Sequence, residues 1–536
     1  MGKNNNLSLG FTDSQRYIFY GFLALLLFPA LLINLGLMPL INDEAIRGLV
    51  ALEMELSGNY ITPTLNGEYY YNKPPLYNWF LLISFWLTGE ASEFTLRLPT
   101  LFFLLAYAAT IFYYVRQHFS NQIALICAFV FLTCGRILFW DSLLGLIDIC
   151  FSWVMFLLFM TVFHRFQKRQ FWQLFLITYT LTAIGFMLKG LPAIVFQAIT
   201  ILTWFIYKKE WKQLFKPANF AGLGLFFLII GSYYLTYHQY NSLENVFTTL
   251  FTESSKRTVV NYGIGNTILH LFTFPFEMIY HFLPWSLLII YFLKKGVLRW
   301  ILQDDFITFC LVIFLANIII YWTSPEVYPR YLLMLVPLLF IVFVYLHQFH
   351  QAERTWQYRV VQGSLFLLIG LVLISFGASF FLERLDIVEG RYWKSALLLM
   401  SAIPLVYFFY QYKNERFAAA FAILLIARIG FNWFVLPDRL ANDWGSLVRE
   451  SAVKSAKRTL GEPLFIYETA RPEEMQSFYI TAVRREILRA KSEDFNTTDY
   501  YIIDPLKSDG KLEYIKYDEV KVRHQKHRLA VAKLKE

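Results

Sequence analysis

The first long polar stretch of the sequence, residues 38–75, carries the side chains best suited to chemistry. Asp43 and Glu44 follow directly after an apolar run, and apolar residues then recur at helical spacing as far as Met54. A carboxylate at the start of such a helix can act as a general base toward a hydroxyl group. It can equally cap the helix or interact with the helix dipole, so the spacing alone leaves both roles open.

Lys73 lies in the same stretch, directly before Pro74 and Pro75. Two consecutive prolines restrict the backbone, so the ammonium group would be held close to the membrane surface. An anionic lipid phosphate could bind there. A lysine whose charged end simply reaches the interface is the alternative.

Further polar segments follow later apolar runs. Asp141 follows Arg136 at the end of one run, and Asp148 lies two helical turns further on. An ionisable residue near or inside a bilayer is a functional candidate by default, although Asp141 could equally be a solvated helix cap. The remaining segments combine acidic, basic and tyrosine side chains, and we expect them on the same face as Asp43: Lys189 to Pro192, Glu253 to Arg257, and Tyr328 to Tyr331. Together they indicate a site for an anionic amphiphile and a polar partner.

The composition excludes an ordinary water-soluble protein. Hydrophobic residues make up 57% and charged residues 16% of the 536 residues, whereas soluble domains have about 45–50% and about 25%. The net charge of +9 indicates basic loops beside anionic lipid rather than nucleic-acid binding. The four cysteines all lie in apolar runs, so we expect no disulfide or zinc framework.

Apolar runs of about 20 residues predict about thirteen membrane-spanning helices. The first run has no small-residue cleavage site after it, so we expect a retained anchor. Basic loops such as 164–169 and 208–212 should be cytoplasmic, which puts the N-terminus inside and the C-terminus outside. The shorter run 76–89 would then lie along the outer interface or dip into it; fourteen spans are the alternative. The expected spans are 16–36, 97–115, 121–139, 142–163, 171–188, 190–207, 217–237, 269–292, 306–322, 331–347, 360–381, 394–411 and 416–435.

The composition changes after Pro437. Residues 438–536 are polar, with short apolar runs at 463–467 and 499–504 and a helical pattern at 446–459. These features predict a small soluble α/β domain on the outer face. We therefore divide the chain into a membrane domain, 1–437, whose outer loop 38–96 carries the chemistry, and an outer domain, 438–536.

Four groups of residues in the first outer loop carry a family resemblance: Asp43-Glu44, Ser57-Gly58, Leu65 to Glu68, and Lys73 to Tyr77. They resemble the first loop of the membrane-embedded glycosyltransferases of the GT-C fold. The most similar branch is the bacterial aminoarabinose transferase of lipid A and its relatives, which are akin to protein O-mannosyltransferases. Weaker matches follow in order at 97–99, 136–141, 188–190, 282–285 and 331–337.

The resemblance implies an inverting transfer from a sugar carried on a polyprenyl phosphate. Asp43 would accept the proton of the acceptor hydroxyl, with Glu44 and Asp141 beside it at the catalytic centre, and Asp141 would order the first loop or bind sugar hydroxyls. The residues implied for the donor phosphate are Lys73, Arg257, Tyr331 and Arg330. Those implied for the sugar or the acceptor are Arg47, Tyr77, Lys189 and Glu253.

Three positions depart from the family pattern. An arginine that often stands three residues after the aspartate is Ile46 here, and Arg47 follows one residue later; both spacings reach the same helix face. Ser254 occupies the place of a common histidine, and Val327 that of a common lysine. These departures concern the donor head group and the acceptor rather than the reaction class.

The sequence leaves several properties open. The acceptor could be lipid A, another glycolipid, a polysaccharide or an exported protein, and the oligomeric state is undetermined. No His/Cys cluster indicates a metal, although enzymes of the fold differ in metal dependence. The expected location is the bacterial inner membrane, with membrane lipids, the lipid-linked sugar and the acceptor as partners, and no nucleic acid. A polytopic transporter or lipid flippase is the alternative, but such a protein would be expected to have broken helices and mid-membrane charges, whereas here the charges gather at one face.

Overall fold

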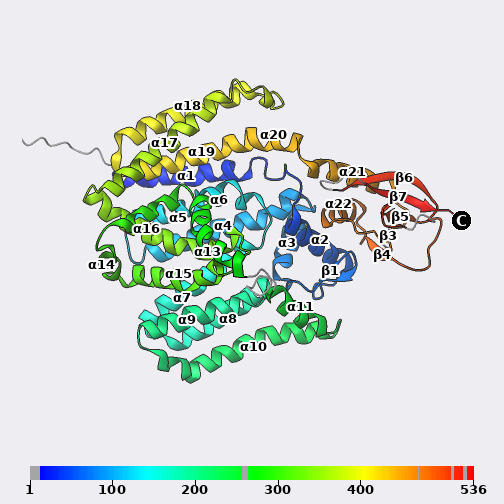
Figure 1. Ribbon diagram of the computed structural model, residues 1–536, viewed down its shortest axis with the longest axis horizontal. Helices are drawn as coiled ribbons and strands as arrows, with labels where there is room; N and C mark the ends of the chain where they lie inside the picture. Colours follow the sequence, from blue (N-terminus) through cyan, green and yellow to red (C-terminus); the bar gives the residue numbers. More distant parts are fainter. Residues whose placement is uncertain (1–11, 256–263, 469, 509–511, 523–527, 536) are drawn as a thin grey trace, which may run out of the picture.

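The computed structural model describes residues 12–535 except 256–263, 469, 509–511 and 523–527. Long helices form a bundle, and a small sheet lies beyond one end of it (Figure 1). We call this end, where α2 begins and the sheet lies, the site end of the bundle. The other end is the opposite end.

Nine helical stretches of the described residues are long and apolar enough to cross a membrane. They comprise α1 (Asp13–Leu32), α4 (Glu93–Val115), α7 (Asp148–Gln167), α8 (Phe171–Lys189), α10 (Pro217–His238), α15 (Asp305–Trp322), α17 (Trp356–Ala378), α18 (Arg391–Gln411) and the stretch Lys413–Ala441, which contains α19 (Arg416–Gly430) and α20 (Leu436–Ala441). A tenth span results if α5 (Asn121–Leu132) and α6 (Gly135–Phe139), which meet at a bend of 47°, are counted together.

The expected thirteen spans are therefore not all found as long apolar helices in the described chain. Two of them are short: α9 (Pro192–Tyr207) has 16 residues and α16 (Val336–Ala352) has 17. A third, 269–292, is divided between α13 (Ile264–His281) and the 3-10 helix η3 (Trp285–Leu293). An apolar run gives the length of a hydrophobic segment but not the position of a helix break, which explains the difference.

The first outer loop folds into α2 (Asn42–Ser57), a two-stranded hairpin of β1 (Thr64–Leu65) and β2 (Glu68–Tyr69), and the short helix α3 (Leu76–Thr88). Gly58 ends α2 with a φ of 68°, a left-handed conformation that suits glycine. The buried Glu53 carboxylate accepts hydrogen bonds from the Thr64 hydroxyl and from the backbone N–H groups of Asn66 and Gly67. Burial raises the pKa of Glu53. This carboxylate fixes the hairpin against α2.

The chain after α20 forms two helices, α21 (Trp444–Arg458) and α22 (Glu474–Arg484), and a five-stranded sheet in the order β4-β3-β5-β7-β6. β3 pairs in parallel with β4 and β5, and β7 pairs antiparallel with β5 and β6. The strands are β3 (Leu464–Tyr467), β4 (Arg489–Lys491), β5 (Tyr500–Ile503), β6 (Tyr514–Lys521) and β7 (Arg528–Leu534). β3, β5 and α21 lie where the sequence predicts two strands and a helix.

The carboxyl-terminal segment packs directly on α2 through α22. The Tyr479 hydroxyl donates to the Glu93 carboxylate and accepts from the N–H of Leu40, just before α2. Arg485 pairs with Glu55 on α2 at 3.1 Å. The contacts of the carboxyl-terminal segment thus fix the residues just before α2 and α2 itself.

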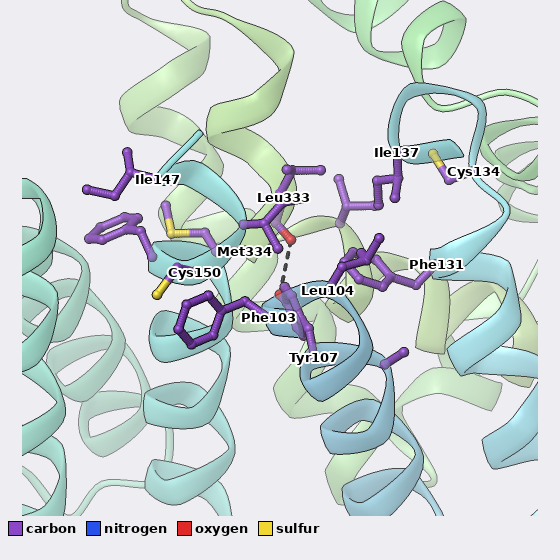
Figure 2. Packing of buried hydrophobic residues seen from close by; sticks show 14 of the residues in the cluster. Phe103, Leu104, Tyr107, Phe131, Cys134, Ile137, Ile147, Cys150, Leu333 and Met334 are labelled. Carbon is purple, nitrogen blue, oxygen red and sulfur yellow. Dashed lines mark hydrogen bonds between the residues drawn. The ribbon is translucent and has the colours of Figure 1, made fainter. Parts of the chain in front are cut away.

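The bundle core fixes a second polar segment, the 3-10 helix η4 (Pro329–Met334). In Figure 2 the side chains of Tyr107 and Phe103 on α4 lie beside Leu333 and Met334. The Tyr107 hydroxyl, fully buried, donates to the Leu333 carbonyl over 3.0 Å. Because η4 also carries Arg330 and Tyr331, this packing sets the position of both.

All four cysteines are buried and free.

Candidate active site

Four charged side chains meet at the site end of the bundle, each from the end of a different helix. Asp43 lies in the first turn of α2, Asp148 begins α7, Lys189 ends α8 and Arg330 lies in η4. Carboxylates at helix starts and a lysine at a helix end match the polarity of the helix dipoles. The helix dipoles therefore stabilise these charges at their positions.

Arg330 joins two of the carboxylates. Its Nη2 lies 2.9 Å from Oδ2 of Asp43, and its Nε lies 3.3 Å from Oδ2 of Asp148. Lys189 Nζ lies 2.5 Å from the other oxygen of Asp148. The Asp148 side chain is only 6% exposed, whereas that of Asp43 is 42% exposed. Asp43 is thus the carboxylate of this group that a substrate can reach.

Tyrosine rings surround the two cations. The Lys189 ammonium lies 4.1 Å from the centre of the Tyr331 ring, and the Arg330 guanidinium lies 4.6 Å from that of Tyr328. The two rings meet edge to face at 5.6 Å. Such cation–π contacts favour the charged forms of both side chains in a partly dry setting.

A second group of charges consists of Arg47 and Lys73. The Arg47 guanidinium is buried, donates to the Tyr70 hydroxyl and lies 4.9 Å from the Tyr70 ring centre. Its Nε and Nη1 have no hydrogen-bond partner within the described chain. Burial and the nearby Arg47 charge lower the pKa of Lys73 to about 8, and the charges of Asp43, Lys189 and Asp148 also act on it. The two groups therefore share one electrostatic site.

The whole site has more positive than negative charges. Asp43 and Asp148 are the two carboxylates, and the cations are Lys189, Arg330, Arg47 and Lys73. Neither Arg47 nor Lys73 pairs with a carboxylate in the part of the chain that the structure describes. A site with a surplus of unpaired cations attracts an anion such as a phosphate.

Glu44 is placed differently from its neighbour Asp43. It is fully buried, and its two oxygens bind Arg97 Nε at 2.7 Å and Nη2 at 3.0 Å. The N–H of Gly145 donates to the same carboxylate over 2.8 Å. Arg97 also donates to the Leu35 carbonyl. Glu44 thus joins the start of α2 to α4 and to the loop before α7, and it has no free oxygen for a substrate.

Two predicted residues, Asp141 and Tyr77, lie at the border of the site or outside it, and two others have no described side chain. Asp141, only 3% exposed, receives both its bonds from Arg136 Nε, at 3.1 and 3.2 Å, in the 3-10 helix η1 (Asp141–Leu143). Tyr77 is fully buried, and its hydroxyl shares a 3.0 Å hydrogen bond with Thr100. It packs α3 on α4 and has no surface for a sugar, which corrects the expected binding role. Glu253 falls in α11 (Glu244–Ser255), but its side chain is outside the described structure, as is the whole of Arg257.

Asp148 is a candidate from the sequence, as an ionisable residue near the membrane, but the sequence assigns it no role in the site. It is the centre of the network, since it contacts both Lys189 and Arg330. The signal was present, because an ionisable residue at the start of an apolar helix is a functional candidate. Its partners could not be read from the sequence, since they lie on other helices.

Within the described residues, no group of three or more His, Cys, Asp or Glu side chains is arranged to hold a metal ion. The two features of the site are a reachable carboxylate and a set of unpaired cations.

Comparison with known proteins gives sequence matches to parts of the chain and a structural match to nearly all of it. Residues 72–237 match the dolichyl-phosphate-mannose-protein mannosyltransferase family. An uncharacterized protein of Aquifex aeolicus is 25% identical over 384 residues, which are 70% of this chain and 81% of that protein. An undecaprenyl phosphate-alpha-4-amino-4-deoxy-L-arabinose arabinosyl transferase of Erwinia tasmaniensis is 27% identical over 178 residues, and the match covers 32% of each chain.

Among solved structures, the chain is similar to ArnT from Cupriavidus metallidurans bound to undecaprenyl phosphate. The TM-score is 0.70 at 15% identity, over 97% of this chain and 98% of that one. The apo state of the same protein gives a TM-score of 0.66. The similarity thus extends over the membrane helices and the carboxyl-terminal segment together. The recognition expected from the first outer loop is confirmed in the fold: the chain has the GT-C fold, and residues 72–237 match the mannosyltransferase family.

Proposed function

We propose that the protein is an inverting glycosyltransferase that moves a sugar from a polyprenyl phosphate to a hydroxyl or phosphate of an acceptor. The observation that carries the proposal is the exposed Asp43 carboxylate beside the unpaired cations Lys73 and Arg47. The family match to mannosyltransferases that use dolichyl phosphate, and the likeness to ArnT bound to undecaprenyl phosphate, support a lipid-phosphate donor.

Asp43 is suited to act as the general base. Its Oδ2 is held by Arg330, whereas its Oδ1 has no hydrogen-bond partner among the described residues. In the proposed step, Oδ1 accepts the proton of an acceptor hydroxyl as the hydroxyl oxygen forms a bond to the anomeric carbon. The bond from that carbon to the phosphate oxygen breaks on the opposite face, and the electron pair leaves with the polyprenyl phosphate. The configuration at the carbon is thereby inverted.

The cations stabilise the leaving group. Negative charge grows on the phosphate oxygen as the bond breaks, and preorganised cations in a water-poor site stabilise such charge strongly. Lys73 and Arg47 have unpaired donors for this role, so Arg47 is better suited to the phosphate than to the acceptor. Tyr331 supplies a hydroxyl group for the phosphate or the sugar. Arg257 is retained as a phosphate ligand on the family resemblance alone.

The remaining charged residues position the reacting groups. Arg330 orients Asp43, and Lys189 with Asp148 orients Arg330. Glu44 is assigned to the placement of α2 rather than to catalysis, because Arg97 and Gly145 occupy both its oxygens. Asp141, paired with Arg136, orders the segment between α6 and α7. We further propose that the reaction takes place at the outer face of a bacterial inner membrane.

The proposal is tested with Asp43→Asn. The amide has the size of the carboxylate but cannot accept the proton, so transfer should fall by about 10²–10⁴-fold while donor binding stays intact. The assay uses purified protein in nanodiscs with a panel of undecaprenyl-phosphate sugars and bacterial envelope acceptors. Glu90→Gln, an exposed change in the loop before α4, serves as the control. If Asp43→Asn kept more than about a tenth of the turnover, the base assignment would be wrong.

The acceptor is found by a separate experiment. Mass spectrometry of lipid A, exported glycans and exported proteins from a deletion strain should reveal one species that lacks a sugar residue. Re-expression of the wild-type chain should restore this sugar, and re-expression of Asp43→Asn should not. Unchanged glycans of every class would contradict the transferase proposal and would favour a transporter or flippase.

A further inference from the structure

A polar cavity lies at the opposite end of the bundle. Its volume is about 230 Å³, and it is enclosed by the start of α5, the last turns of α16, the start of α17 and the start of α19. Because α5 and α19 run from here toward the site end, the cavity is separated from Asp43 by the length of the bundle (Figure 1). The proposed transfer reaction does not use it.

The lining of this cavity combines polar and apolar side chains and has no carboxylate. The polar groups are hydroxyl, amide and cationic side chains, including Ser120, Gln348, Gln351, Gln362, Lys413 and Arg416. Lys413 is exposed, and no ion pair engages it within the described chain. A cavity lined by cations and amide donors without an acidic group suits an anion.

Arg416 is held in place without being neutralised. Its Nε donates to the Phe409 carbonyl over 3.2 Å, and its Nη1 donates to Oε1 of Gln362 over 2.8 Å. Both partners are uncharged, and the other guanidinium N–H groups remain available. The neighbouring Glu415 does not compete, because it is 2% exposed and pairs with Arg16 at 2.7 Å.

Gln362 gives a second, independent indication of a ligand. Its side chain lines the cavity yet is only 7% exposed. Oε1 is used by Arg416, but Nε2 has no hydrogen-bond partner among the residues that the structure describes. The Nε2 group is accessible from the cavity, so it is a donor whose hydrogen bond a bound anion could accept in place of water.

Two helix starts add to the positive potential. α5 begins at Asn121 and α19 at Arg416, and both starts border the cavity. Ser120 caps α5 by accepting the N–H of Ile123. The positive ends of two helix dipoles thus act on the same space as Lys413 and Arg416.

We propose that this cavity binds the phosphate of an anionic phospholipid from the membrane leaflet at the opposite end. Basic pockets between membrane helices are the usual sites for such head groups. A lipid rather than a soluble phosphate is favoured by the surface beside the cavity, because Phe366 on α17 is exposed next to Arg416 and offers apolar surface to an acyl chain. Phe366 also lies 4.9 Å from the Arg416 guanidinium.

The test is lipid binding to the purified full-length protein in detergent, followed by native mass spectrometry. Phosphatidylglycerol should be retained over phosphatidylcholine, and Lys413→Gln and Arg416→Gln should each weaken retention about fivefold. Gln351→Glu should weaken it too, since it adds a carboxylate to the cavity. Arg299→Gln, an exposed arginine of α14 (Val297–Leu302) at the same end, should change nothing.

Two results would overturn the assignment. If Lys413→Gln and Gln351→Glu retained phosphatidylglycerol at the wild-type level, the lipid would not bind in this cavity. Displacement of the lipid by excess inorganic phosphate, with equal thermal stabilisation by the two, would assign the cavity to a soluble phosphate instead. Neither result depends on sugar transfer, so the proposed enzymatic activity stands or falls separately.

Discussion

Arg330 binds Asp43 through a 2.9 Å ion pair, although 287 residues separate them in the chain. The pair joins η4, which the bundle core holds, to the first turn of α2, which lies outside the long helices. It leaves one oxygen of Asp43 without a partner in the described chain. The proposed base is therefore oriented by a residue that does not itself need to touch the substrate.

Substitution of Arg330 should separate orientation from binding. Arg330→Gln removes the contacts to both Asp43 and Asp148, so kcat should fall by about 10²-fold, whereas the KM for the donor should change little. Arg330→Lys should recover part of kcat, because an ammonium reaches one carboxylate but lacks the planar fork. Steady-state kinetics measure both constants. Arg384→Gln, which removes an exposed arginine paired with Asp438, is the control. A rise in KM alone would instead make Arg330 a donor ligand.

Donor binding should weaken as the pH rises through about 8. Burial and Arg47 lower the pKa of Lys73 to about 8, so the ammonium is present below this pH and lost above it. Only the charged form attracts the donor phosphate. The measurement is the dissociation constant of a polyprenyl phosphate between pH 6 and pH 10. Lys73→Arg should remove the step near pH 8, since arginine keeps its charge throughout this range. A step that persists in Lys73→Arg would belong to another group.

Glu44→Gln should reduce stability rather than chemistry. The change leaves the buried Arg97 without its carboxylate, and breaking a buried ion pair costs about 3–5 kcal/mol. Thermal unfolding in detergent should therefore shift downward. The folded fraction that remains should keep a turnover close to that of the wild type. A stable variant without turnover would return Glu44 to the catalytic centre.

Cysteine labelling tests the expected orientation of the chain. A membrane-impermeant thiol reagent added from outside should label Ser92→Cys and Ser508→Cys but not Gln167→Cys. The background should be low, because the four native cysteines are buried. Labelling of Ser92→Cys only after the inner face is opened would instead support fourteen spans.

The sequence predicts the parts of the site that follow one another in the chain. The start of α2 beside Asp43 and the placement of Lys73 before α3 both follow from local patterns. The partners of these residues do not, because they depend on packing between distant helices. Arg97 lies in an apolar run, where nothing marks it as the partner of Glu44. Asp148 is visible as an ionisable residue at a helix start, but its contacts with Lys189 and Arg330 require the fold.

The docking of α22 on α2 has a consequence for biosynthesis. α2 is among the first segments to leave the ribosome, yet Arg330 follows much later and Tyr479, which binds the N–H of Leu40, later still. In a nascent chain that ends before η4, Asp43 therefore lacks its contact with Arg330. The proposed transfer activity therefore requires a nearly complete chain, and we expect unfinished chains to be inactive.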